Sequence, residues 1–100
     1  SAPALEQVNN LTANIWQRAY AKSLDKIAEL EQAILTLQAG KLDETLRQQT
    51  IFTAHKLAGS LGVFGFEVAA QLSQQIEDVF RQAKVPQTST TQLLQWIQAL

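Results

Sequence analysis

The stretch from Thr53 to Gly65 reads Thr-Ala-His-Lys-Leu-Ala-Gly-Ser-Leu-Gly-Val-Phe-Gly and holds the only histidine of the 100-residue chain. Apolar residues and threonines around it recur at helical spacing, which predicts a helix with one buried stripe. The stripe consists of Leu42, Leu46, Thr50, Thr53, Leu57, Leu61 or Ser60, and Phe64. His55 lies two positions from both Thr53 and Leu57, and two residues turn an α-helix by about 200°. We therefore expect His55 to point away from the core.

The outer face of this predicted helix carries an aromatic residue, an imidazole and two glycines in place of the usual charged side chains. Phe52 lies one turn before His55, while Gly59 lies one turn and Gly62 two turns after it. A glycine inside a helix costs about 1 kcal/mol relative to alanine. We expect this cost to be offset by access, because another macromolecule can then approach the imidazole closely. The alternative is a loosened helix end, which suits Gly62 better than Gly59.

Composition excludes several classes of protein. A net charge of -1 provides no basic field to attract nucleic acid or anionic lipid. The absence of cysteine excludes a disulfide framework and a thiolate metal site, and a single histidine argues against a transition-metal site. No apolar run approaches the roughly 20 residues that cross a bilayer, no signal-peptide pattern opens the chain, and no glycine-rich loop offers a site for ATP. We predict one cytoplasmic domain over residues 1–100, taken from a larger protein.

The fold class follows from how few helix breakers the chain contains. Two prolines and four glycines interrupt it, and no alternating β-branched run is present, so we predict an all-α protein. The expected helices cover residues 4–8, 9–39, 41–65, 66–83 and 88–100, with Gly40 ending the second. Short loops favour neighbours that run in opposite directions. The predicted fold is an antiparallel up-down four-helix bundle with a short extra N-terminal helix.

The central stretch resembles the signature of histidine-containing phosphotransfer (HPt) domains. That family carries a His-x-Leu-Lys-Gly-Ser core, a glycine ten residues after the histidine, and a Leu-Glu pair further on. The matching positions are His55, Leu57, Gly59, Ser60, Gly65 and the pair Ile76-Glu77. The resemblance runs from about Ile15 to Lys84 and includes the apolar pattern of the preceding helix, at Trp16, Leu24, Leu30, Ile34 and Leu37. It departs from the family at Ala58, where the lysine of the signature is absent.

The resemblance implies a phosphocarrier of two-component signalling, within a larger multidomain signalling protein. His55 would accept a phosphoryl group from a receiver-domain phosphoaspartate on Nε2 and pass it to another receiver aspartate. Receiver domains and a hybrid histidine kinase are the expected partners, and Mg²⁺ would be supplied by the receiver. Two alternatives stay open. One is the phosphoacceptor domain of a chemotaxis-type histidine kinase, fed by ATP from a separate catalytic domain. The other is a non-catalytic helical bundle for protein docking.

Three further residues are candidates for work around the phosphoryl group. Some family members place the glutamate equivalent to Glu77 against the histidine's Nδ1–H, which would fix the tautomer; otherwise Glu77 is a solvated helix residue. Lys56 could bring its ammonium toward a phosphate on His55, or be a plain solvated lysine. Ser60 could hydrogen-bond the phosphoryl group, or bond back to a helix carbonyl.

An apolar docking patch is predicted beside the histidine. Ile51 and Phe52 are adjacent apolar residues just before His55. If exposed, they would form a surface for a partner protein. The alternative is that they pack against the preceding helix or the N-terminal segment.

Overall fold

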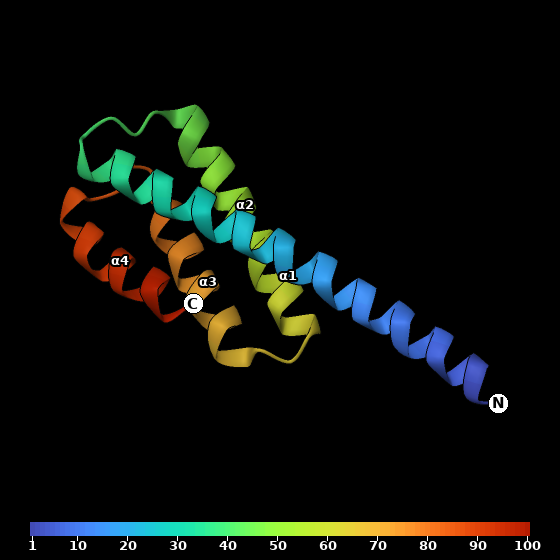
Figure 1. The fold of residues 1–100 in the computed structure, drawn as a ribbon. Coiled ribbons are helices and arrows are strands. Elements are labelled where there is room, and N and C mark those ends of the chain that lie inside the picture. The colour runs from blue at the N-terminus through green and yellow to red at the C-terminus, as the bar shows by residue number, and fades with distance from the viewer.

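The chain folds into four α-helices and one 3-10 turn, without strands. The computed structural model describes residues 1–100. Its elements are α1 (Ala2–Gln38), α2 (Glu44–Val63), α3 (Glu67–Phe80), η1 (Gln87–Ser89) and α4 (Thr90–Ala99). Figure 1 shows the second half of α1 gathered with α2, α3 and α4 into a bundle, while the first half of α1 extends away from it. This confirms the prediction of an all-α four-helix bundle. None of the helices combines the length and apolar character needed to cross a membrane.

The short extra N-terminal helix was predicted wrongly. α1 is continuous from Ala2 to Gln38, so the predicted boundary between residues 8 and 9 lies inside it, together with Asn9, Asn10 and Thr12, whose side chains are of the kind that caps helices. The Thr12 hydroxyl donates to the carbonyl of Val8, 2.9 Å away, as it can within a helix. Asparagine and threonine cost only a fraction of a kcal/mol inside a helix, which is less than the cost of starting a new one. Without a proline or glycine to interrupt the ladder, cap-forming residues alone do not break a helix.

Two glycines in the left-handed region end α1 and α2. Gly40 has φ 72° and Gly65 has φ 82°. At each helix end, the N–H of the glycine and the N–H of the residue after it donate to carbonyls of the last helical turn. This pair of hydrogen bonds requires a left-handed residue, a conformation that glycine adopts easily. The four bonds are Gly40 to Leu37, Lys41 to Thr36, Gly65 to Gly62 and Phe66 to Leu61. The prediction for Gly40 is confirmed, and Gly65 sets the end of the helix that carries His55.

The other helix ends differ from prediction by a few residues. α2 begins at Glu44 because Asp43 caps it, its Oδ1 accepting from the Leu46 N–H at 2.7 Å. α3 ends at Phe80, three residues before the predicted Ala83. Pro86 restricts the residue before it and excludes a helical bond to Gln82, but neither effect reaches Phe80, so Pro86 does not set the last turn of α3. The carbonyls released at that end are bound by a side chain of α2, described below.

The core draws on all four helices. Its buried apolar residues are Leu30, Ala33, Ile34, Leu37, Ile51, Ala54, Leu57, Ile76, Phe80, Leu93 and Ile97. On α2 the buried stripe is rotated from the predicted one, since Thr53 is half-buried and Phe64 is exposed. Ile51 is only 8% exposed, so its assignment to an exposed docking patch is wrong. The reason is that α2 packs against both α1 and α3, which widens its buried face to include Ile51 and the small Ala54.

Candidate functional site

His55 lies on the outer surface of α2. Its side chain is 69% exposed. Leu57, two residues further on, is completely buried in the core. The two-residue offset therefore turns the imidazole outward, as the helical spacing predicts.

A buried glutamate on α3 holds one nitrogen of this exposed ring. His55 Nδ1 lies 3.1 Å from Oε1 of Glu77. Glu77 is only 6% exposed, so it is not the solvated helix residue of the alternative interpretation. An ionised carboxylate can only accept hydrogen bonds, so the shared proton sits on Nδ1. In a neutral imidazole this leaves the lone pair on Nε2, which has no hydrogen-bond partner in the domain.

Arg81 completes the surroundings of Glu77. Its Nε and Nη2 lie 2.7 Å and 2.6 Å from Oε2, the carboxylate oxygen that His55 does not contact. A buried carboxylate is costly unless it is paired, and Arg81 together with His55 provides that pairing. The sequence-based site does not include Arg81. The signal was present, because Glu77 and Arg81 are four residues apart, the spacing at which opposite charges meet on one helix face.

The two helical glycines border open space. A Cβ added at Gly59 or Gly62 would meet no heavy atom within 4 Å. Neither residue has a positive φ, so the backbone does not require glycine there. Neither packing nor backbone conformation within the domain therefore requires these two glycines. They leave the helix surface without side chains one turn and two turns after His55.

Lys56 and Phe52 form a pair on the α1 side of His55. The Lys56 ammonium lies 4.5 Å from the centroid of the Phe52 ring, and Phe52 is 60% exposed. Both residues line a hollow between α1 and α2, whose charged residues on α1 are Lys22, Lys26, Asp25 and Glu29. A cation over an aromatic face at an exposed site contributes about 0.5–1 kcal/mol, little enough for Lys56 to turn elsewhere when a stronger anion arrives.

Ser60 is half-buried one turn beyond Lys56. Its hydroxyl is not among those that donate to the carbonyl four residues earlier, which belong to Thr12, Thr36, Thr50 and Ser73. The alternative interpretation of Ser60, a bond back to the helix, is therefore not seen. Its bond to a phosphoryl group stays a prediction.

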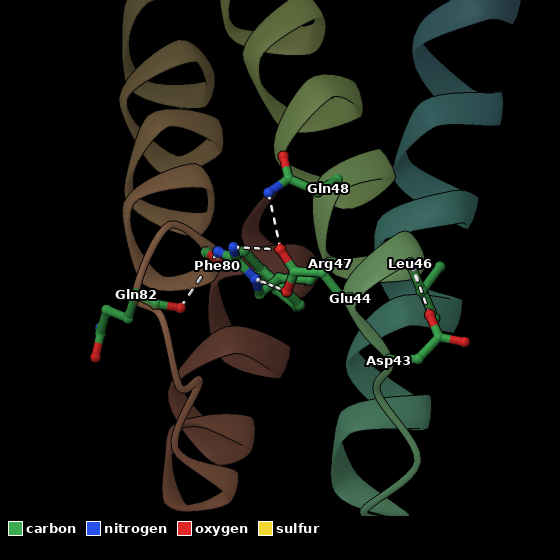
Figure 2. Close-up of polar contacts among 7 residues, drawn as sticks. All are labelled: Asp43, Glu44, Leu46, Arg47, Gln48, Phe80 and Gln82. Atoms are coloured by element: carbon green, nitrogen blue, oxygen red, sulfur yellow. Dashed lines mark hydrogen bonds and ion pairs between the residues drawn. The ribbon is translucent and has the colours of Figure 1, made fainter.

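A second polar cluster joins α2 to α3 two turns before His55 (Figure 2). The Arg47 side chain is 14% exposed, and its Nη1 donates to the carbonyls of Phe80 at 2.8 Å and Gln82 at 3.3 Å. Its Nε and Nη2 donate to the two oxygens of Glu44 at 2.8 Å and 2.7 Å. Hydrogen bonds from Arg47 and then Gln48 lower the pKa of Glu44 from 4.5 to about 2. The cluster binds one carbonyl at the end of α3 and one just beyond it, and it contains no free nucleophile.

Comparisons with known proteins bear on the whole domain. The family model described as Hpt domain matches residues 14–100. Protein RcaC of Microchaete diplosiphon is 37% identical over 62 residues, which cover 62% of this chain and 10% of RcaC. The matched segment thus spans about a tenth of the length of that relative. No solved structure matches the chain.

Proposed function

This chain belongs to the family of histidine-containing phosphotransfer domains, and we propose that His55 is the residue on which it carries the phosphoryl group. Hpt domains are phosphocarriers of two-component signalling rather than kinases, and they interact with receiver domains and histidine kinases. The finer proposal concerns direction. The phosphoryl group comes from the phosphoaspartate of one receiver domain and leaves to the aspartate of another.

One observation supports this role more than any other: an exposed imidazole whose Nδ1 rests on a buried carboxylate. The Nε2 lone pair attacks phosphorus while the P–O bond to the donor aspartate breaks, so that an N–P bond forms and a carboxylate leaves. The proton stays on Nδ1. The positive charge that develops on the ring is stabilised by Glu77, 3.1 Å away. The reverse attack by an acceptor carboxylate returns His55 to its starting state.

Access supports the same proposal. In-line attack needs the phosphorus atom about 3–3.5 Å from Nε2. The active-site loops of the partner must therefore contact the surface of α2 directly. Gly59 and Gly62 leave open space beside the ring. Phe52 and Lys56 offer a half-apolar, positively charged contact on the other side, and Lys56 can reach a phosphate when it leaves the Phe52 ring. Ser60 is the remaining candidate for a hydrogen bond to the phosphoryl group.

The partner supplies what the domain's own side chains do not. No group of three or more histidine, cysteine or carboxylate side chains is arranged to hold a metal ion. We therefore assign the Mg²⁺ of the reaction to the receiver domain. We also propose that the domain has no ATP site of its own and works in the cytoplasm, where it meets receiver domains.

The test is direct phosphotransfer. The domain is incubated with phosphorylated receiver domains and Mg²⁺, and acid-labile, base-stable phosphate is sought on the wild type and on His55→Gln. Label on the wild type alone supports the proposal. Label that persists in His55→Gln contradicts the assignment of His55. Label that comes only from ATP and a separate kinase catalytic domain, and from no receiver, contradicts the proposed donor and favours the chemotaxis-type alternative.

A further inference from the structure

The first half of α1 carries an apolar face that is largely uncovered in the domain, with Trp16 contacting Phe64 and Phe66 at its end. Figure 1 shows this part of the helix leaving the bundle. The molecule is 58 Å long but only 22 by 19 Å across. Seven large apolar side chains on this half are between 40% and 65% exposed: Leu5, Val8, Leu11, Ile15, Trp16, Tyr20 and Leu24. So much contiguous apolar surface is uncommon on a monomer.

This face continues the buried stripe of the same helix. Leu30, Ile34 and Leu37 line the core from the second half of α1. Stepping back from Leu30 by three or four residues reaches Ile27, Ser23, Ala19, Trp16 or Ile15, Thr12, Val8 and Leu5. A stripe at this spacing marks a helix side that is buried against another helix. The protruding half therefore has the pattern of a packed helix and lacks its partner.

A complementary opening lies next to it, beside the part of α1 that α4 does not cover. α4 has 10 residues and α1 has 37, so α4 covers only part of the core side of α1. Beyond Leu100 lies a hollow of about 380 Å³ with ten hydrophobic residues among the eleven that line it. Its wall includes Trp16, Tyr20 and Leu24 of α1 and Phe64 and Phe66 of the α2–α3 turn. The Trp16 ring centroid lies 5.3 Å from that of Phe64 and 5.6 Å from that of Phe66.

We propose that a second copy of the chain covers both features. The first halves of two α1 helices pair in opposite directions around a two-fold axis close to Ile15. Residues 2–14 of each copy then lie across the hollow of the other. At 1.5 Å per residue the protruding segment is about 20 Å long, and the α1 side of the hollow, from Trp16 to Ile27, is about 17 Å long. The protruding segment and the α1 wall of the hollow are successive stretches of one helix. A single two-fold rotation therefore places the segment of each copy on the hollow of the other.

Area and charge fit this occupant. Seven side chains that are about half exposed, together with Phe64 and Phe66, offer on the order of 800 Å² per copy, the share that each partner contributes to a standard stable interface. Residues 2–14 carry one charge, the negative Glu6, while residues 16–27 carry a net charge of +2 from Arg18, Lys22, Lys26 and Asp25, so the two stretches that pair across the axis attract each other. None of the proposed site residues His55, Glu77 and Lys56 lines the hollow, so each copy in the dimer keeps its own site.

The mass of the chain in solution tests the proposal. Sedimentation equilibrium of the wild type is expected to give twice 11.1 kDa at micromolar concentration. Val8→Glu places a charge in the interface and is expected to weaken the dimer at least tenfold. Asn10→Glu adds the same charge two residues away on the opposite side of the helix and leaves the dimer unchanged. Both positions are exposed, so circular dichroism should show equal helix content. A wild type of 11.1 kDa at 100 μM, or equal weakening by both variants, would overturn the proposal.

Single cysteines test the arrangement, because the chain has none of its own. In the antiparallel pair, Ile15→Cys lies close to its symmetry mate and should form a disulfide-linked dimer on mild oxidation. Leu5→Cys lies about 30 Å from its mate, at 1.5 Å per residue, and should not. Cross-linking at both positions indicates parallel helices and contradicts the arrangement, and cross-linking at neither contradicts the dimer. Phosphotransfer assayed on the same variants is a separate readout, since the interface leaves His55 uncovered.

Discussion

Two clusters, each with a glutamate and an arginine, join α2 to α3. One cluster buries its cation, and the other buries its anion. In the cluster near the start of α2, the cation is inside: the Arg47 side chain is 14% exposed and its partner Glu44 is 66% exposed. In the cluster around His55 the anion is inside: the side chain of Glu77 is 8% exposed, while those of His55 and Arg81 are 69% and 55% exposed. Both use a glutamate and an arginine within one turn of a helix.

This reversal separates a structural cluster from a reactive one. Buried Arg47 uses its donors on Glu44 and on the end of α3, so nothing in the cluster is left to react. Buried Glu77 instead holds one nitrogen of an exposed ring and leaves the other nitrogen outside. The burial of each partner, rather than the presence of an ion pair, therefore indicates which cluster does chemistry.

The largest expected effect comes from removing the ring. His55→Gln should abolish phosphotransfer, because no other side chain at this surface can form the N–P bond. The His55 side chain is 69% exposed and Arg81 still pairs with Glu77 in the variant, so the free energy of unfolding should fall by no more than about 1 kcal/mol. Transfer from a phosphorylated receiver and urea unfolding measure the two quantities. A variant that unfolds at much lower urea would show that the His55 cluster is structural, like that of Arg47.

Blocking access to the ring should cost nearly as much. Gly59→Leu should fold, since a Cβ there meets nothing within 4 Å, yet slow transfer about 100-fold by holding the receiver away from Nε2. Gly59→Ala is the matched control. It should raise the free energy of unfolding by about 1 kcal/mol with a much smaller effect on transfer. Normal transfer by the leucine variant would refute the role of the glycine in access.

The Arg47 cluster should show the opposite profile. Arg47→Met keeps most of the apolar stem but leaves the carbonyls of Phe80 and Gln82 without this donor. We expect a loss of about 1–3 kcal/mol in the free energy of unfolding, with transfer by the folded protein unchanged. Chemical denaturation followed by a transfer assay well below the midpoint separates the two. Loss of transfer in the folded variant would break the distinction between the clusters.

Neutralising the buried anion should have an intermediate effect on rate. Glu77→Gln retains an oxygen that can accept from Nδ1 but loses the charge that stabilises the developing imidazolium. We expect transfer to slow about tenfold. Arg81→Gln, which leaves the carboxylate in place, is the control and should slow transfer less. Equal rates for the wild type and Glu77→Gln would leave Glu77 with a structural role only.

Helical spacing was enough to predict the orientation of His55, because the offset between His55 and Leu57 is a matter of rotation about one axis. The same reasoning was wrong for Ile51, since spacing does not reveal that α2 has two neighbours. Gly40 was predicted correctly because a glycine after a long helical pattern has few other uses.

The contact between His55 and Glu77 crosses from one helix to another, and spacing within a helix cannot supply it. It was expected only through the resemblance to the Hpt family. Arg81 and Asp43 were missed although both carry local signals, an i,i+4 charge pair and an N-cap followed by Glu44. The contact of Arg47 with Phe80 joins residues 33 positions apart and has no sequence signal.

The smallest expected effect tests the exposed anion of the Arg47 cluster through pH. The pKa of Glu44 is about 2 in the folded chain against 4.5 for a free side chain, because Arg47 and Gln48 hydrogen-bond its ionised form. Its contribution to stability is therefore complete above pH 4.5 and is lost as the pH falls toward 2. The Tm advantage of the wild type over Glu44→Gln should shrink across this window, since the other carboxylates titrate in both proteins. In an Arg47→Met background the same substitution should lose most of this pH dependence, because the main cause of the lowered pKa is gone. If the pH dependence persists in the Arg47→Met background, Arg47 does not hold Glu44 in solution. The Arg47 cluster would then consist only of the hydrogen bonds between Arg47 and the end of α3.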